Sequence, residues 1–326
     1  MPYSSRRLKR FAVAAGLLAL GGTITPPRGD EPTIRDWQVG GDPATSVDIL
    51  FVGDGYLQRE VGKKFAVDLN RYAKRLLEEE PFLRFKKRFN IRGLVVPSRD
   101  RGCDAAANED LVDSALDCRF DTKDGRLLTV HDDARLLELV KGAGAVDIAF
   151  VMVNTERYGG AGATLSGLEG RERPLPAPVF SAQDTTSFLI AIHELGHSFA
   201  DLADEYVDAG SHRTFPLPSN DVDLADANVT LPSHVDRISF ESIAASVKWG
   251  HFLALPGAKK HEWLHTGGYY RSSGVLRPWE RCRMRDHDDP FCPICDEEIG
   301  KAIVACLGET WDDAAWHKER PLSDWK

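Results

Sequence analysis

Residues 185–206, TTSFLIAIHELGHSFADLADEY, contain the pattern that decides the fold of this chain. Four large apolar residues of this stretch recur at helical spacings: Phe188, Ile192, Leu195 and Phe199. At about 100° per residue they form one narrow stripe along a helix. We therefore predict a helix that packs this stripe against the core of the protein.

Two histidines on the predicted helix have the spacing of metal ligands. His193 and His197 lie one turn apart, about 6 Å along the axis and opposite the stripe, so both imidazoles can reach one ion. A zinc ion held by neutral imidazoles stays cationic and can activate water and polarise a peptide carbonyl. We predict one catalytic zinc ion here, with Glu194 as the general base. The alternative is an ordinary helix that carries two unrelated histidines.

A catalytic zinc site needs a third protein ligand and one position left for water. Asp201, Asp204 and Glu205 are the nearby carboxylates. We favour Asp204, with Glu205 as the alternative. In an unbroken helix Asp204 would lie about 10 Å beyond His197, so the helix must end or bend near Ala200.

Hydrolysis also needs a donor that stabilises the oxyanion beside the metal. Tyr206, His265 and Tyr270 are candidates that the sequence does not place relative to the helix. The other histidines are interpreted as surface residues: positions 131, 212, 234, 251, 261, 287 and 317.

The first thirty residues have the layout of an export signal. Four basic residues, Arg6, Arg7, Lys9 and Arg10, precede the apolar run FAVAAGLLAL at residues 11–20. Ten apolar residues fall short of the roughly 20 that span a bilayer. We predict an export signal at residues 1–30, a periplasmic or extracellular protein, and no stable membrane span after signal removal. A short membrane anchor is the alternative.

Charge and composition exclude some partners. The chain has a formal charge of −9, which argues against nucleic acid because phosphate binding needs a basic face. Its 42% hydrophobic and 28% charged residues are typical of a globular protein. The sequence carries no signal for an oligomeric state.

An even number of cysteines in an exported chain predicts disulfides. The six candidates all lie outside the signal: Cys103, Cys118, Cys282, Cys292, Cys295 and Cys306. Cys103 and Cys118 close a short polar loop and are the pair we expect. Cys292-x-x-Cys295 would also suit structural zinc, but a second close cysteine pair is missing, so we disfavour that interpretation.

Apolar runs at residues 47–52, 89–96 and 146–153 predict strands, and helical spacing predicts helices ending at Leu77 and over residues 134–140. This order predicts an α/β (α+β) fold with a mixed sheet. Residues 99–124 are interpreted as a surface excursion. Residues 207–280 are rich in loops, with helical spacing only near residues 238–252.

The motifs HELGHSF at residues 193–199 and LADEY at residues 202–206 resemble the IgA-specific metallopeptidase family, a metzincin-like group of secreted bacterial zinc peptidases. Further segments look like its signatures: DILFVGDGY (48–56), FDT (120–122), VNTERYGG (153–160), RP (277–278), Cys282, MR (284–285) and FCPIC (291–295). The resemblance runs from about residue 45 to residue 300. It implies one catalytic domain over residues 31–326, with an upper half near 45–206 and a lower half near 207–326.

The resemblance implies a metzincin-like fold, with the zinc helix under a mixed twisted sheet and a Met-turn at Met284 beneath the metal. It also suggests that a strand at residues 163–166 forms the edge of the substrate cleft. The sequence departs from the general metzincin pattern at Ala200 and Ala203, where that pattern has glycine and a third histidine. Nothing in the sequence encodes cleavage of immunoglobulin.

The expected function is therefore that of a secreted zinc endopeptidase acting on a peptide or protein substrate. Two alternatives stay open. One is a catalytically silent relative that binds zinc and peptide. The other is a zinc amidase acting on cell-wall material, which would use the same metal chemistry in a different cleft.

Overall fold

The structure is a computed structural model that describes residues 31–325, except residues 209, 212–214, 220–221 and 259–262. The predicted export signal at residues 1–30 lies outside the described residues. Among the helices of the described part, none is long and apolar enough to cross a membrane.

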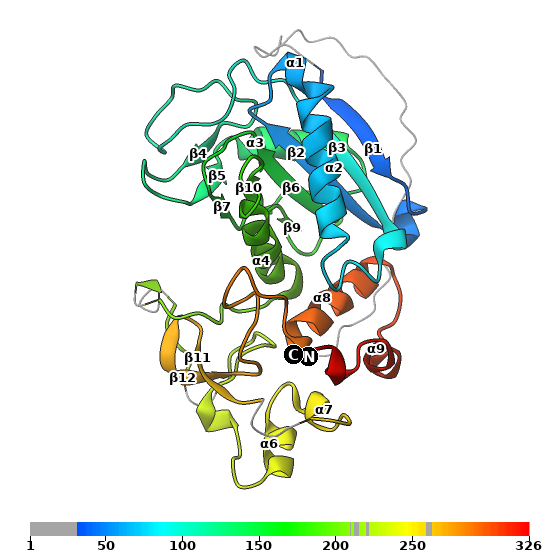
Figure 1. Cartoon of the computed structure of the whole chain (residues 1–326), viewed down its shortest axis with the longest axis vertical. Helices are drawn as coiled ribbons and strands as arrows, with labels where there is room; N and C mark the ends of the chain where they lie inside the picture. The colour runs from blue at the N-terminus through cyan, green and yellow to red at the C-terminus, as the bar shows by residue number, and fades with distance from the viewer. Residues whose placement is uncertain (1–30, 209, 212–214, 220–221, 259–262, 326) are drawn as a thin grey trace.

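A six-stranded mixed sheet forms the upper part of the molecule (Figure 1), in the order β1-β3-β2-β6-β10-β7. Its strands are β1 (Thr33–Gln38), β2 (Val47–Asp54), β3 (Phe89–Val95), β6 (Ile148–Val153), β7 (Gly160–Ala161) and β10 (Val179–Ser181). The four inner strands are parallel, whereas β1 and β7 run antiparallel to their neighbours. The predicted α/β class with a mixed sheet is confirmed, and β2, β3 and β6 fall where strands were predicted.

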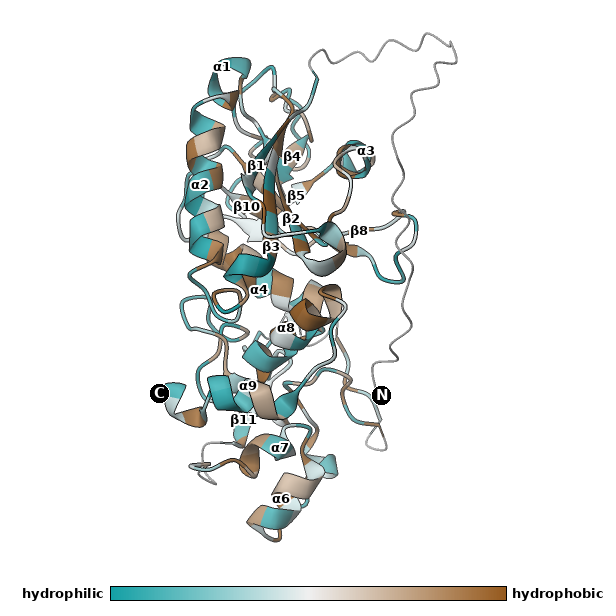
Figure 2. Ribbon diagram, turned by 90° about the vertical axis from the view of Figure 1, so that its right-hand side faces the viewer, coloured by the Kyte–Doolittle hydropathy of each residue, from teal (hydrophilic) through white to brown (hydrophobic). Residues whose placement is uncertain are grey.

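Helices cover both faces of this sheet. They are α1 (Gln58–Val61), α2 (Lys64–Leu76), α3 (Asp133–Gly142) and α4 (Ser187–Ala200). Ile49 and Phe51 of β2 join the apolar cluster with α2 and α4, while Leu50 and Val52 join the cluster with α3. Figure 2 shows α2 and α3 on opposite sides of the sheet. Because both faces are buried, β6 and most of β2 are continuous apolar runs rather than alternating ones.

Two small sheets flank the main one. They are β4 (Cys118–Phe120) with β5 (Leu128–Val130), and β8 (Thr164–Leu165) with β9 (Leu175–Pro176). The strand predicted at residues 163–166 is β8, which pairs with β9 in a separate sheet. It therefore lies outside the main sheet, whose edge strand on that side is β7.

The excursion at residues 99–124 is less exposed than predicted. The carboxylate of Asp54, at the buried end of β2, accepts hydrogen bonds from the Ser114 hydroxyl and from the backbone N–H groups of Leu116 and Cys118. A buried carboxylate needs such donors, so the excursion folds back over the strand end.

The lower part of the molecule contains short helices and one hairpin (Figure 1). Its elements are α6 (Phe240–Ser246), α7 (Gly250–Leu253), β11 (His265–Gly268), β12 (Arg271–Arg277), α8 (Pro293–Cys306) and α9 (Asp313–Glu319). Single 3-10 turns are η1 (Pro43–Thr45), η2 (Lys86–Arg88), η3 (Pro232–His234) and η5 (Leu322–Asp324). Phe188 and Leu195 of α4 share one apolar cluster with Ile299 and Ile303 of α8, so one core joins the two parts.

All six cysteines lie in the described part, and no disulfide joins them. The expected Cys103–Cys118 disulfide is not formed. Instead, the Cys118 thiol hydrogen-bonds to Asp54 and the Cys103 thiol to Thr155.

Candidate metal centre

Helix α4 carries the predicted ligands and ends where the sequence required. Just before its start, the Asp184 carboxylate accepts the backbone N–H groups of Thr186 and Ser187. It ends at Ala200 because Asp201 adopts left-handed backbone angles, φ 52° and ψ 42°. Aspartate tolerates this conformation better than most residues other than glycine. The turn sends the following residues back toward the two histidines.

Three donor atoms converge beside α4. The Nε2 atoms of His193 and His197 lie 3.2 Å apart, and Oδ1 of Asp204 lies 3.0 Å from the first and 3.2 Å from the second. The Nδ1 atoms of the two histidines lie 2.9 Å and 2.6 Å from the carbonyl oxygens of Arg283 and Leu202. Because a carbonyl only accepts, each Nδ1 donates, so Nε2 is the atom through which the neutral form of each imidazole can bind a metal ion.

The three atoms fit a metal ion. Nitrogen and oxygen ligands about 2.0–2.1 Å from a tetrahedral ion lie about 3.3 Å from one another. Oδ1 of Asp204 is buried and accepts no hydrogen bond. Burial alone would lower the pKa of His197, but the Asp204 and Glu194 carboxylates outweigh it and raise this pKa to about 9. The cluster therefore attracts positive charge.

Glu205, the alternative third ligand, belongs to a different group of side chains. Its carboxylate accepts a hydrogen bond from Asn228 and lies 3.6 Å from the sulfur of Cys295. Burial, followed by the charge of Cys282, raises the pKa of Glu205 well above its usual range. Asp204 and Glu205 are consecutive residues, yet their carboxylates belong to different groups of side chains.

Glu194 lies at the edge of the main sheet and is partly exposed. A Cβ atom at Gly162, just after β7, would lie 2.3 Å from Oε2 of Glu194. The carboxylate is therefore held against a backbone that only glycine allows to approach so closely. The negative charge of Glu194 contributes to the raised pKa values of His197 and Tyr206.

Met284 lies against the turn of α4 that separates the two histidines. It is fully buried, and a Cβ atom at Gly196 would lie 2.7 Å from its sulfur. Its carbonyl oxygen accepts the backbone N–H of Glu205 at 2.7 Å. The preceding residue, Arg283, supplies the carbonyl that orients His193 and forms a 2.8 Å ion pair with Glu79.

Two of the three predicted oxyanion donors lie at the site. Tyr206 and Tyr270 both lie near Asp204, and their rings lie 5.5 Å apart. Burial, together with Asp204, raises the pKa of both phenols, so they remain donors. Tyr270 has a left-handed φ of 66° at the hairpin tip, where its carbonyl accepts the N–H of Asp208. His265 instead begins β11, paired with Arg277.

His287 was interpreted as a surface residue, and this interpretation is wrong. Its ring is half-buried and lies 4.6 Å from the ring of His193. Burial, followed by the charges of His193 and Arg126, lowers the pKa of His287 to about 4. The feature of the sequence that could have placed His287 near the metal ligands is its position three residues after Met284.

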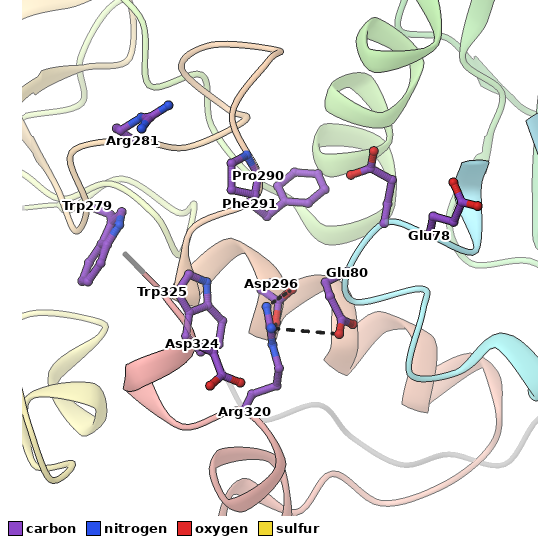
Figure 3. A pocket seen from close by; sticks show the side chains of 11 residues that line it. Glu78, Glu80, Trp279, Arg281, Pro290, Phe291, Asp296, Arg320, Asp324 and Trp325 are labelled. Carbon is purple, nitrogen blue, oxygen red and sulfur yellow. Dashed lines mark hydrogen bonds and ion pairs between the residues drawn. The ribbon is translucent and has the colours of Figure 1, made fainter. Parts of the chain in front are cut away.

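A separate cavity of about 370 Å³ lies between α8, the residues after α9 and residues 78–80 (Figure 3). Asp296 and Arg320 line it, and Arg320 forms ion pairs with Asp296 at 3.3 Å and Glu80 at 3.9 Å. None of the predicted site residues lines this cavity, so we do not assign it to catalysis.

The HExxH helix, its cluster of donors and the mixed sheet are typical of metallopeptidases, hydrolases that require a metal ion. The family profile described as IgA Peptidase M64 matches residues 36–258, more than half of the chain, and the chain belongs to this family. It is therefore a metallopeptidase that acts on peptides or proteins. The match includes both histidines, Glu194, Asp204 and Glu205, and ends before Cys282. No curated protein matches the chain in a sequence comparison.

Proposed function

We propose that the chain is an exported zinc endopeptidase whose ion is held by His193, His197 and Asp204. The observation that carries this proposal is the convergence of three lone-pair atoms within 3.2 Å of one another. Two imidazoles and one carboxylate are a donor set of catalytic zinc sites that leave one position open. A bound zinc ion would lower the pKa of a water molecule to about 7 and polarise the peptide carbonyl.

Glu194 is the proposed general base. Its carboxylate takes the proton from the attacking water and returns it to the leaving amine. Two observations support this role: Gly162 leaves room for the carboxylate, and the charge of the carboxylate acts on His197. Tyr206 and Tyr270 are the proposed donors to the developing oxyanion, since their hydroxyl groups stay protonated beside Asp204.

The fold is proposed to be metzincin-like, with Met284 in the Met-turn. Support comes from the packing of Met284 against Gly196 and from the hydrogen bond that links its carbonyl to Glu205. Edge strand β7, next to α4, is where an extended substrate would add as a further strand. The shared core supports one catalytic domain over residues 31–326, with the halves near 45–206 and 207–326.

Export rests on the basic and apolar pattern of residues 1–30. N-terminal sequencing of the protein recovered outside the producing cells tests it. Recovery of full-length protein only in the cytoplasm would contradict export.

The catalytic role is tested with Glu194→Gln. This substitution keeps the shape of the side chain but removes the base, so kcat on a broad peptide library should fall by about 100-fold to 10,000-fold. Zinc content should not change. Equal cleavage by both proteins would rule out the role of Glu194, and no cleavage by either would favour the silent zinc-binding or amidase alternatives.

A further inference from the structure

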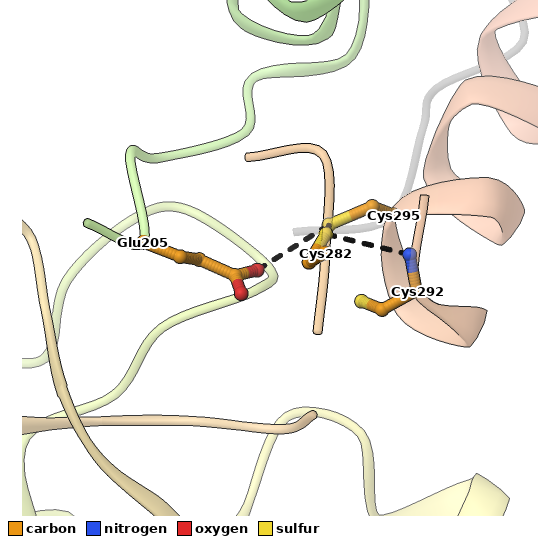
Figure 4. A group of neighbouring side chains, drawn as sticks. All are labelled: Glu205, Cys282, Cys292 and Cys295. Carbon is orange, nitrogen blue, oxygen red and sulfur yellow. Dashed lines mark hydrogen bonds between the residues drawn. The ribbon is translucent and has the colours of Figure 1, made fainter. Parts of the chain in front are cut away.

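Four buried side chains meet in a second cluster, which includes the residue after Asp204 (Figure 4). They are Glu205, Cys282, Cys292 and Cys295, none more than 1% exposed. Each can offer one ligand atom such that all four atoms lie within 4.8 Å of one another. They come from three segments: the residue after Asp204, the loop after β12 and the start of α8.

The spacing of these atoms suits a tetrahedral ion. The sulfurs of Cys282 and Cys295 lie 3.6 Å apart, and the Cys295 sulfur lies 3.6 Å from Oε1 of Glu205. Zinc with sulfur at about 2.3 Å and oxygen at about 2.0 Å separates two sulfurs by about 3.8 Å and sulfur from oxygen by about 3.5 Å. A disulfide needs sulfurs about 2.05 Å apart and would leave the third thiol and the carboxylate unused.

The carboxylate of Glu205 is only partly satisfied. Asn228 donates to Oε1, but Oε2 is buried and accepts no hydrogen bond. Arg277 lies nearby, but its hydrogen bonds go to the carbonyl oxygens of Thr266 and Gly267 and not to the Glu205 carboxylate. A buried carboxylate with an open lone pair is costly unless a cation lies beside it.

Two of the three cysteines lie at the start of α8. Cys292 is its N-cap and Cys295 lies in its first turn, where the helix dipole stabilises negative charge. The backbone N–H of Cys292 points at the sulfur of Cys282 at 3.3 Å, as second-shell donors do around metal ligands. The C-x-x-C spacing is that of structural zinc sites.

We propose that Glu205, Cys282, Cys292 and Cys295 bind a second, structural zinc ion. Four protein ligands complete the tetrahedron, so this ion has no open position and takes no part in hydrolysis. The sequence analysis disfavoured zinc here because it required a second cysteine pair, whereas the fourth ligand is a glutamate from a distant segment. The ion would brace both sides of the catalytic cluster, because Asp204 precedes Glu205 and Arg283 follows Cys282.

Zinc content tests the proposal. Reduced, zinc-loaded wild-type protein should hold about two ions per chain by elemental analysis, and the double variant Cys292→Ser with Cys295→Ser about one. Cys306→Ser is the matched control, a cysteine at the far end of the same helix, and should keep both ions. About one ion in the wild type, or two in the double variant, would overturn the proposal.

Cobalt substitution keeps the test decisive if the double variant does not fold. The variant His193→Ala with His197→Ala should still show sulfur-to-cobalt charge-transfer absorption, because the thiolates are intact. The absence of this absorption, or a Cys282–Cys295 disulfide in peptide maps of the reduced and zinc-loaded wild type, would overturn the proposal. This readout is independent of peptidase activity, so it is unaffected by failure of the proposed catalytic function.

Discussion

Asp204 and Glu205 are consecutive residues, yet each belongs to a different cluster of potential metal ligands. The Asp204 cluster has two imidazoles and one carboxylate and lies next to the partly exposed Glu194. The Glu205 cluster has three thiols and one carboxylate and is fully buried. Ligand number and accessibility, more than position in the sequence, distinguish a site that can do chemistry from one that can only hold the fold together.

The largest expected effect is that of metal removal. A mild chelator should first strip the open His193 cluster and abolish activity while the protein stays folded. Loss of the closed sulfur site should follow and lower the free energy of unfolding by about 4 kcal/mol, if zinc was present at about 1,000 times its Kd. Zinc release, activity and thermal unfolding are measured on the same samples. Thermal destabilisation that precedes the loss of activity would contradict this order.

A matched pair of substitutions compares the two clusters directly. Asp204→Asn should lower kcat/KM by more than about 100-fold, because even second-shell partners of a metal are commonly worth 10-fold to 100-fold. Glu205→Gln should leave kcat/KM within about 10-fold and lower the affinity of the sulfur site instead. Steady-state kinetics and chelator competition separate the two effects. A greater loss of activity in Glu205→Gln would reverse the assignment.

The cluster of His193, His197 and Asp204 was largely readable from the sequence because its members lie within one helix and the turn after it. The apolar stripe of α4, the one-turn spacing of His193 and His197, and the required stop near Ala200 are all local properties. The sulfur cluster was not readable, because Glu205 and Cys282 meet only through tertiary folding. Likewise, no local pattern indicates that Tyr270 reaches Asp204 from a hairpin tip.

The inner strands β2 and β6 were predicted because burial on both faces makes them continuous apolar runs. The short strand β10 and helix α8 were not predicted, since a three-residue strand carries little periodicity and α8 is apolar on most of its surface. The excursion at residues 99–124 was misjudged because its polar composition conceals its role as a set of donors to Asp54.

A smaller effect is expected at Gly162. An added methyl group would meet Oε2 of Glu194, so Gly162→Ala should displace the carboxylate and lower kcat by roughly 10-fold to 100-fold. Both metal clusters should keep their zinc, because the ligands do not move. Gly62→Ala, where nothing lies within 4 Å of an added Cβ, is the control and should not change kcat. Unchanged activity in Gly162→Ala would mean that the carboxylate works from another position.

The smallest effect concerns the cysteines outside the sulfur cluster. Burial, followed by the charge of Asp54, raises the pKa of Cys103 to about 12, and burial raises the pKa of Cys118 well above its usual range. Because only the thiolate reacts, alkylation of Cys103 by iodoacetamide should be slow at pH 8 and rise about tenfold per pH unit up to about pH 11.

Zinc should have no influence on this alkylation, whereas it should protect Cys282, Cys292 and Cys295. Peptide mass mapping after timed labelling, with and without zinc, distinguishes the two groups of cysteines. The same protonation makes a Cys103–Cys118 disulfide slow to form at neutral pH, because oxidation also begins with a thiolate. Labelling of Cys103 that is fast at pH 8 and does not change with pH would contradict the proposed environment of its thiol.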